Sequence, residues 1–378
     1  MIRVLHITRR YWPFVGGVET FVKNLAERQV KAGKLVSVLT LRDFSSKKSE
    51  QRSLTGDEIK NGVTIYRLRS FGLRNYRFAP HLLDYFRFAD VVHVHNVDYL
   101  SEYIGLLKKR HKRPLILSTH GGFFHNQTFK TMRHMRLKLF TAVSLRCYDY
   151  ILCTSEEDCR IFGPYCSKYT RFPNAIKLPH AQKLDRLHDE ETIIFIGRLQ
   201  KHKQVDLLIR CLELVIHKYG GDNIKCFVIG SDWGEKTNLQ HLISLYGLTE
   251  NVFLCGEVND IEFEKFQLKC GLFVSPSAFE SFGIGVIESM AWGNLVMVND
   301  IPAHREFIRN GENGWLTDFS NVEGSAELLL KILRLSVSEK SRIRNNARIS
   351  SERYSWDNRY NELEKVYNYV MSSLKKKA

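Results

Sequence analysis

The sequence predicts an α/β protein that contains two doubly wound units, each a mainly parallel sheet with helices on both faces. Its 378 residues exceed the size of one ordinary core, which favours more than one domain. Short apolar runs rich in β-branched residues alternate with amphipathic stretches, and such continuous apolar strands are typical of parallel sheets buried on both faces. A polar segment with two prolines, residues 172–189, interrupts this alternation, so two units joined near residue 180 are expected.

The first unit is predicted to span residues 1–178. It opens with a strand over Ile2–Thr8, a helical pattern over Val18–Ala32 and a second strand over Leu35–Leu41. Further strands, each next to helix-like sequence, are expected at Asp90–His95, Leu115–Thr119 and Tyr150–Thr154. This alternation of strands and helices predicts a doubly wound sheet.

The second unit is predicted to span residues 179–355, and residues 356–378 are predicted to form a C-terminal helix. Short buried strands are expected at Thr192–Gly197, Lys225–Gly230, Val252–Cys255, Leu272–Ser275 and Leu295–Asn299. Helical patterns separate them, as over Gln204–Lys218 and Ile287–Ala291. The segment Tyr354–Leu374 is amphipathic and follows the second unit without a Gly/Ser linker.

The positive charge of the chain is concentrated in its first half. The formal net charge is +15; residues 1–180 hold 31 Lys and Arg against 14 Asp and Glu, whereas residues 181–378 hold 25 against 27. A one-sided basic surface indicates a nucleic acid, an anionic lipid surface or a phosphorylated substrate as the partner. The charge alone leaves these three classes open.

Membrane spanning and secretion are not expected. No apolar run reaches the roughly 18 residues that a bilayer requires, and arginines near the N-terminus precede any hydrophobic stretch of a signal peptide. The eight cysteines show no CxxC pair and no metal-finger spacing, which suits buried thiols in a reducing compartment. A cytoplasmic location is therefore expected.

The most informative local pattern is Ser275–Ser289, which leaves a predicted strand, passes through a glycine-containing turn and enters a helix. Free N–H groups of the first helical turn, around Gly283 and Ile284, suit an anion such as a diphosphate. Glu280 and Glu288 offer carboxylates, which accept hydrogen bonds from the hydroxyl groups of a ribose or a sugar. From the residues alone, acidic side chains that merely favour the helix dipole explain the pattern equally well.

Two features of the first half also indicate a ligand. Gly16 and Gly17 remove side chains at a turn after the first strand, which lets backbone N–H groups approach an oxyanion; a simple tight turn is the alternative. His120 follows a buried strand, at the sheet edge where open α/β folds bind ligands. His93 and His95 alternate to one face of a strand, but with no third metal ligand evident they are interpreted as strand or cleft residues.

Several motifs, in order, resemble the retaining glycosyltransferases of family four, which include glycogen-synthase-like and mannosyl-transferring enzymes. Residues 275–293 resemble their E-x7-E signature, and residues 197–208 resemble their Gly-Arg-Leu…Lys-Gly segment. Residues 173–176 resemble the Pro-Asn-Gly hinge, residues 12–19 the glycine loop, and residues 90–95 a strand of the first domain. The resemblance implies the GT-B fold, with two Rossmann-like domains facing a central cleft and a C-terminal helix that crosses back to the first domain.

The resemblance implies roles for most of these residues. Arg198 and Lys203 correspond to cations that bind the donor diphosphate, and His120 and Glu280 complete the catalytic set. Donor-binding groups are expected at Gly16, Gly17, Gly197, Glu257, Val258, Phe282, Gly283, Ile284 and Glu288. Fixed cations beside a departing diphosphate stabilise its growing charge, an effect typically worth several kcal/mol.

Three positions depart from the family pattern. Gly285 stands where proline is frequent, and Ala175 and Gln204 stand where glycine is frequent. None of these departures removes a charged group, so they bear on the identity of the donor more than on activity.

The acceptor side is expected in the basic first half. Basic residues between positions 108 and 146 are interleaved with Leu, Phe and Met, and Thr131–Leu145 is predicted to be a basic amphipathic helix. Contacts with an acceptor or a membrane are expected from Lys130, Arg133, Arg136 and Lys138. An ordinary surface helix packed on the sheet is the alternative. Because the first domain binds the acceptor in the family, peripheral association with the inner face of the cell membrane is expected.

These observations lead to the hypothesis of a retaining, metal-independent hexosyltransferase. It would move a hexose from a nucleotide sugar, GDP-mannose in preference to a UDP-sugar, to a polyprenyl-diphosphate-linked oligosaccharide or other glycan in surface polysaccharide synthesis. Residues 119–130 resemble a loop of bacterial mannosyltransferases with such acceptors, which favours mannose. No Asp-x-Asp motif occurs, so neither a metal nor another cofactor is expected. The alternatives are a non-catalytic nucleotide-sugar-binding subunit, a nucleotide-sugar epimerase and a nucleic-acid-binding protein.

Overall fold

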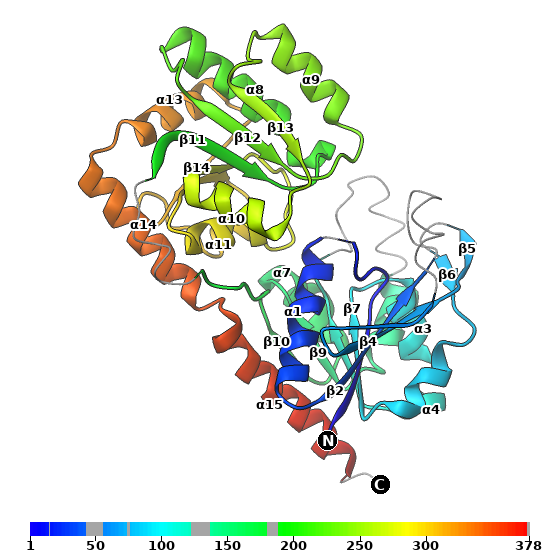
Figure 1. Cartoon of the computed structure of the whole chain (residues 1–378). Coiled ribbons are helices and arrows are strands. Elements are labelled where there is room, and N and C mark those ends of the chain that lie inside the picture. The colour runs from blue at the N-terminus through cyan, green and yellow to red at the C-terminus, as the bar shows by residue number, and fades with distance from the viewer. Residues whose placement is uncertain (15, 43–55, 74–75, 122–136, 180–187, 376–378) are drawn as a thin grey trace. The chain divides into compact units, whose positions relative to one another are not determined.

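The chain divides into two compact units, shown in the computed structural model in Figure 1. The first unit comprises residues 1–175 and 359–378, and the second comprises residues 176–358. The structure describes residues 1–14, 16–42, 56–73, 76–121, 137–179 and 188–375. The boundaries predicted after residues 178 and 355 each lie three residues from these divisions.

The first unit is built on an eight-stranded sheet in the order β10-β9-β8-β7-β1-β2-β4-β3. Its strands are β1 (Arg3–Ile7), β2 (Leu35–Leu41), β3 (Glu58–Lys60), β4 (Val63–Leu68), β7 (Val91–His95), β8 (Leu115–Ser118), β9 (Tyr150–Cys153) and β10 (Tyr169–Arg171). Neighbouring strands pair in parallel except β3 and β4, which form an antiparallel hairpin. Every residue of β7 and β8 is buried, as expected for central strands covered on both faces.

Helices cover both faces of this sheet. They are α1 (Gly17–Lys31), η1 (Leu82–Phe88), α3 (Tyr99–Leu106), α4 (Lys108–His111), η2 (Leu137–Thr141), α6 (Ala142–Leu145), α7 (Glu156–Phe162), η3 (Gly163–Tyr165) and most of α15 (Trp356–Lys375). A small hairpin, β5 (Phe71–Leu73) with β6 (Tyr76–Phe78), stands apart from the sheet. The α15 helix buries Leu363, Tyr367 and Val370, whose spacing of four and three residues places them on one helical face.

The second unit has a six-stranded, fully parallel sheet in the order β13-β12-β11-β14-β15-β16. Its strands are β11 (Asp189–Ile196), β12 (Lys225–Ile229), β13 (Val252–Gly256), β14 (Cys270–Ser275), β15 (Leu295–Asn299) and β16 (Trp315–Thr317). Its helices are η5 (Lys201–Lys203), α8 (Val205–Glu213), η6 (Leu214–Lys218), α9 (Lys236–Leu245), α10 (Asp260–Lys269), α11 (Ile284–Ala291), α12 (Pro302–Arg305), α13 (Val322–Leu333) and α14 (Val337–Glu352).

Alternate residues of β11 face two separate cores. Ile193 and Phe195 pack with residues of α8, α9 and α13, whereas Ile194 packs with residues of α11 and α14. This alternation is the period of two expected of a strand, and it explains why β11 reads as a continuous apolar run. Each such buried aliphatic or aromatic side chain contributes about 1.5–3 kcal/mol through the hydrophobic effect.

Two predicted helices differ from the observed elements. The predicted helix Gln204–Lys218 is observed as α8 followed directly by the π-helical turn η6, and Gln204 itself has a left-handed φ of 49°. The predicted helix Thr131–Leu145 is described only from Leu137, as η2 and α6. Within the described part of the chain, no helix has the length and apolar character needed to cross a membrane.

Candidate active site

Polar side chains gather where strands β11 and β14 of the second unit end. Arg198 and η5 follow β11, the segment that contains Glu280 follows β14, and these two strands pair in parallel. The carboxyl ends of parallel strands meet at the same sheet edge, where open α/β folds bind ligands. The predicted residues Arg198, Lys203 and Glu280 therefore lie on connections that leave one edge of a single sheet.

Lys203 and Glu280 form an ion pair at this edge. Nζ of Lys203 donates to Oε1 of Glu280 at 2.5 Å, and the two side chains are only 15% and 18% exposed. The backbone also joins these segments, because the N–H of Ala278 donates to the carbonyl of His202 at 2.9 Å. Burial alone would raise the pKa of Glu280, but the charge of Lys203 and its hydrogen bond hold that pKa below its ordinary value. Glu280 is therefore a charged acceptor held by a largely buried cation.

The α11 helix begins at this edge with an open N-terminus. Gly283 is its N-cap residue, has a left-handed φ of 90°, and leaves the helix without a side-chain cap. A Cβ atom on Gly283 would lie 3.2 Å from Cζ of Phe307, so both the backbone and the available space favour glycine. The uncapped N–H groups of Ile284 and Gly285 give the first turn its capacity to bind an anion.

Two other predicted donor residues have environments unlike that of Glu280. Burial raises the pKa of Glu288 to about 7, and the nearby charge of Asp260 adds to this effect. Glu288 is therefore partly protonated near neutral pH. The Phe282 ring is buried against Phe307 and Tyr354 in the core, so only the backbone of Phe282 remains for a ligand.

Arg198 lies beside a residue that sequence reasoning missed. Its guanidinium stacks over the Trp233 ring at 4.9 Å, and Trp233 is 43% exposed.

A second missed residue, Gly230, approaches the backbone of Gly197 so closely that a Cβ atom on Gly230 would lie 1.9 Å from the Gly197 carbonyl oxygen. The sequence signal for this close approach was a glycine directly after a buried strand.

Glu257 and Val258 follow β13 at the same edge of the sheet. Gly256 has a left-handed φ of 72°, and its carbonyl accepts a hydrogen bond from the N–H of Gly230 at 2.8 Å. Glu257 is exposed and Val258 is partly exposed. Both residues are therefore accessible to a ligand.

His304 is the third residue that sequence reasoning did not single out. It is fully buried in the short helix α12, and its Nδ1 lies 2.7 Å from the carbonyl oxygen of Asn299. Its Nε2 has no hydrogen-bond partner among the described residues. A Cβ atom on Gly283 would lie 3.5 Å from this Nε2, so the nitrogen faces the start of α11. Burial lowers the pKa of His304, and the nearby Glu280 only partly offsets this effect, so Nε2 is an unused acceptor.

In the first unit, His120 follows β8 with both ring nitrogens engaged. Nε2 lies 3.1 Å from Nδ1 of His95, and Nδ1 lies 3.2 Å from Oδ1 of Asn174. The His120 backbone N–H donates to Oγ1 of Thr154 at 2.9 Å, and its φ of 51° is left-handed. Burial lowers the pKa of His120 to about 4, so the ring is neutral at physiological pH.

The predicted glycine loop connects to His120 through a helix. Gly16 is the N-cap residue of α1, and Gly17 is its first residue. The extended backbone of Gly16, with a φ of 178°, is one that any residue adopts, so the conformation alone does not explain this glycine. One turn further, Phe21 places its ring against the edge of His120 with the centroids 4.9 Å apart. The helix that begins at the glycine loop therefore contacts His120 through Phe21.

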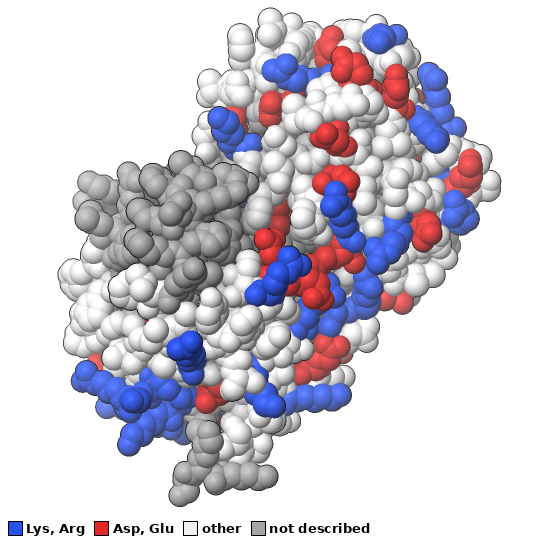
Figure 2. Space-filling view, turned by 180° about the vertical axis from the view of Figure 1, so that it is seen from behind, with Lys and Arg blue, Asp and Glu red and all other residues white. Residues whose placement is uncertain are grey.

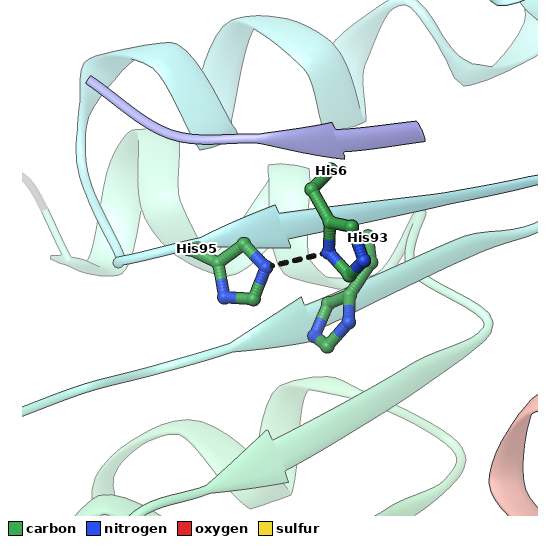
Figure 3. Close-up of side chains that lie close together, drawn as sticks. All are labelled: His6, His93 and His95. Carbon is green, nitrogen blue, oxygen red and sulfur yellow. Dashed lines mark hydrogen bonds between the residues drawn. The ribbon is translucent and has the colours of Figure 1, made fainter. Parts of the chain in front are cut away.

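The interpretation that no third ligand accompanies His93 and His95 was wrong. His6 of β1 joins them, and the three residues offer ligand nitrogens that lie within 4.8 Å of one another (Figure 3). The strand pairing explains this, because His6 lies directly opposite His93 in the parallel register of β1 and β7. The missed signal was a histidine inside the first apolar strand.

The predicted acceptor residues fall largely outside the described part of the chain. Three of them, Lys130, Arg133 and Arg136, lie outside the described residues. Lys138 lies in η2, but its side chain is not described. Leu139, Phe140 and Val143 are exposed. A separate basic cluster occupies the region of α4, with Lys109, Arg110 and Lys112 exposed. Figure 2 shows a dense group of basic side chains there and a mixture of both signs over the second unit.

Two family models match the chain, one for each half. The model of Glycosyltransferase Family 4 matches residues 15–178, and the model of Glycosyl transferases group 1 matches residues 178–350. The GDP-mannose:cellobiosyl-diphosphopolyprenol alpha-mannosyltransferase of Xanthomonas campestris is 27% identical over 361 residues, which cover 94% of this chain and 93% of that protein. The protein of the same name from Komagataeibacter xylinus is 25% identical, covering 98% of this chain and 94% of that one.

Solved structures share the fold over almost the full length. Sucrose-phosphate synthase from Thermosynechococcus elongatus is similar with a TM-score of 0.78 and 17% identity, covering 99% of this chain and 100% of that one. Anabaena HepE in complex with UDP-glucose is similar with a TM-score of 0.77 and 17% identity, covering 98% and 100%. These similarities show the two-domain GT-B fold that the sequence predicted.

Proposed function

Because the chain belongs to the glycosyltransferases of family four and is a hexosyltransferase that uses nucleotide sugars, we propose that it transfers mannose from GDP-mannose to a polyprenyl-diphosphate-linked oligosaccharide. Full-length similarity to mannosyltransferases named for this donor and acceptor supports the proposal. The product would serve surface polysaccharide synthesis. A UDP-sugar donor is the alternative.

The observation that carries the proposed chemistry is the arrangement of Lys203, Glu280 and the start of α11. A donor diphosphate would bind the uncapped N–H groups of α11, with Arg198 and Lys203 as its cations. Glu280 would accept hydrogen bonds from sugar hydroxyl groups. The negative charge on the leaving diphosphate grows in the transition state, so preorganised cations stabilise that state more than the ground state.

We assign no metal to this reaction. Two cationic side chains and a helix N-terminus supply the positive charge that a divalent ion would otherwise give to the diphosphate. We also assign no protein nucleophile; attack on the same face of the sugar, with the departing phosphate oxygen helping to take the acceptor proton, would retain the configuration. In the first unit, the assigned catalytic group is His120.

Lipid-linked acceptors require access to a membrane surface, and the first unit offers suitable residues. Lys109, Arg110 and Lys112 are exposed on and directly after α4, and Leu139 and Phe140 expose more than half of their surface. Each basic residue near an anionic bilayer contributes about 1 kcal/mol of attraction. We therefore propose that the protein associates peripherally with the inner face of the cell membrane.

The test is a donor panel with matched variants. Purified protein is incubated with GDP- and UDP-sugars and a polyprenyl-diphosphate-linked oligosaccharide, and released nucleotide and extended lipid are measured. Release from GDP-mannose, lost in Lys203→Ala and Glu280→Ala but kept in Lys201→Ala, is expected. Lys201 is the matched control because it is exposed on the same turn, η5. Donor binding without release would favour the non-catalytic subunit, and release from UDP-sugars alone would overturn the assignment of GDP-mannose.

A further inference from the structure

Five buried side chains of the first unit form one continuous chain of contacts. Oε1 of Gln29 lies 2.7 Å from Nε2 of His6, and Nδ1 of His6 lies 3.0 Å from Nε2 of His95. Nδ1 of His95 lies 3.1 Å from Nε2 of His120, and Nδ1 of His120 lies 3.2 Å from Oδ1 of Asn174. All five residues are buried. The contacts therefore use both nitrogens of three consecutive imidazoles.

The number of available hydrogens limits how these five side chains can be hydrogen-bonded to one another. Each of the four contacts needs one hydrogen, and the carbonyl oxygens of Gln29 and Asn174 at the two ends can only accept. Three neutral imidazoles carry three N–H groups in total, which is one fewer than the four contacts require. The chain is satisfied either by one extra proton or by turning one terminal amide so that its NH2 group donates.

The burial of the three imidazoles disfavours the extra proton and so favours a turned terminal amide. It lowers the pKa of His6 and His120 to about 4 and lowers the pKa of His95 well below its ordinary value, so all three rings are neutral near pH 7. One terminal amide must then be turned. Nε2 of Gln29 is buried and makes no hydrogen bond of good geometry among the described residues, although the Tyr367 hydroxyl lies close to the Gln29 amide, and a buried unpaired donor costs about 1–3 kcal/mol.

Turning the Gln29 amide replaces this unpaired donor by the carbonyl oxygen, which can accept a hydrogen bond from the neighbouring Tyr367 hydroxyl. Nε2 of Gln29 then donates to Nε2 of His6, and Nδ1–H of each histidine donates to the next member of the chain. The last of these bonds runs from Nδ1–H of His120 to Oδ1 of Asn174, which keeps its present orientation. The amide orientation and the imidazole tautomers therefore follow from the hydrogen-bond network as a whole.

We infer that Gln29, His6 and His95 are positioning residues that hold His120 as a single tautomer, with a hydrogen on Nδ1 and a lone pair on Nε2. The ring is thereby locked in place between His95 and Asn174, and Phe21 packs against the edges of both His95 and His120. The role of His120 in transfer rests on the proposed function, but the tautomer itself does not.

A metal ion at His6, His93 and His95 is the competing interpretation of the same residues. Figure 3 shows His6 and His95 facing each other along their hydrogen bond. An ion would have to replace this bond and one of the two bonds of His93, whose Nδ1 lies 2.7 Å from the Tyr367 hydroxyl and whose Nε2 lies 2.8 Å from Oγ of Ser118. The geometry therefore favours the hydrogen-bonded chain.

The test reads the ring nitrogens directly. Long-range proton–nitrogen NMR spectra of 15N-histidine-labelled protein, assigned with single variants, separate protonated from unprotonated ring nitrogens. For His6, His95 and His120 we expect a protonated Nδ1 and an unprotonated Nε2. His95→Phe should shift both ring nitrogens of His120, whereas His93→Phe, from the same buried strand, should leave them unchanged.

A second variant tests the hydrogen count should His95→Phe fail to fold. In Gln29→Glu an ionised carboxyl can only accept, so the hydrogen-bonded chain should take up one proton, either on an imidazole or on the introduced carboxyl. An imidazolium signal at His6, His95 or His120, or the 13C signal of a protonated carboxyl at position 29, is expected near pH 7. An unprotonated Nδ1 on His120 in the wild type, unchanged signals in both variants, or stoichiometric Zn²⁺ binding that displaces the signals of His6, His93 and His95 together would overturn the inference.

Transferase activity is measured separately from the tautomer. With GDP-mannose and the lipid acceptor, His95→Phe should lower kcat by about tenfold or more because it misplaces His120, whereas His93→Phe should stay within about threefold. If the wild type transfers no sugar from any donor, the proposed function fails while the ring-nitrogen result still decides this inference. An active His95→Phe protein with an altered His120 tautomer would show that the chain does not serve transfer.

Discussion

Gly283 and Gly285 lie two residues apart at the start of α11, but only Gly283 has a left-handed backbone. A Cβ atom on Gly283 would meet Phe307 at 3.2 Å and His304 at 3.3 Å, whereas the nearest atom to a Cβ on Gly285 is the Ile196 carbonyl oxygen at 3.6 Å. One glycine is therefore required by the conformation, and the other is replaceable.

The first prediction is an opposite effect of two identical substitutions. Gly285→Ala should raise the free energy of unfolding by about 0.4–1 kcal/mol, because alanine reduces the entropy of the unfolded chain without strain. Gly283→Ala should lower it by about 1–3 kcal/mol through backbone strain and close contacts. Urea unfolding of both variants checks this, and equal shifts of the same sign would contradict it.

The second prediction concerns the carboxyl of Glu190 in β11. Arg344 donates from two nitrogens to its two oxygens at 2.9 and 3.0 Å, and Lys340 lies 3.2 Å away. Burial alone would raise the pKa of Glu190, but these cations hold it below its ordinary value. Because the folded pKa is lowered, the stabilisation is present above the ordinary glutamate pKa and is lost as the pH falls through the folded pKa.

Glu190→Gln should therefore lower the unfolding free energy at pH 7 by about 1 kcal/mol, since Glu190 is partly exposed, and by less as the acid range is approached. Urea titrations at pH 7 and in the acid range measure this. Glu191→Gln, an exposed neighbour, is the control and should have no effect at either pH. A constant loss at both pH values in Glu190→Gln would contradict the ion pair.

The third prediction concerns Glu288, for which the dependence of stability on pH has the opposite sign to that of Glu190. Its folded pKa is about 7, above the ordinary value, so the ionised form is the unfavourable one in the folded protein. Wild-type stability should fall as the pH rises from the ordinary glutamate pKa to about 7. Glu288→Gln should be similar to the wild type in stability at pH 5 and more stable at pH 8, as measured by thermal unfolding. Lower stability at pH 8 would contradict the prediction.

The fourth prediction concerns the unused acceptor of His304. His304→Asn retains a side-chain N–H for the Asn299 carbonyl but removes the Nε2 acceptor. If Nε2 accepts a hydroxyl group of the donor sugar, KM for the donor should rise about tenfold with a smaller change in kcat. Steady-state kinetics measure both constants, and a lower kcat at unchanged KM would exclude this role.

The fifth prediction addresses the basic cluster at α4. The triple replacement of Lys109, Arg110 and Lys112 by alanine should weaken binding to anionic vesicles by about 1 kcal/mol per residue at low salt. Flotation at rising ionic strength measures this, because screening should remove the difference. The control is Arg210, Lys236 and Lys265 replaced by alanine, all exposed in the second unit. Equal binding of both triples would contradict a membrane role for α4.

Most strands were predictable because each buried strand is a short apolar run bounded by polar sequence. The hairpin of β3 and β4 was missed, although Asn61 and Gly62, both with positive φ, mark its turn. Gln204 stands where the family frequently has glycine, and its left-handed φ of 49° explains why glycine is common at that position.

The candidate site was predictable only where a local motif marks it. Glu280 and Lys203 lie in recognisable segments, and their ion pair joins them across 77 residues of sequence. His304 and His6 lack such a motif, because their significance comes from neighbours that the sheet register brings together. No local pattern shows that Gln29 of α1 and Asn174 lie at two ends of one hydrogen-bonded chain.

The path of the chain has a consequence for dissecting the enzyme. It passes from the first unit to the second after Ala175 and returns after Asn358 within the continuous helix α15. A single proteolytic cut after Asn358 would leave residues 1–358 as one polypeptide, whereas a cut after Ala175 would leave residues 1–175 held only by their packing on residues 359–378. A fragment that ends at Ala175 would lack Leu363, Tyr367 and Val370, so its core would be incomplete and an expression trial should fuse the last twenty residues to it.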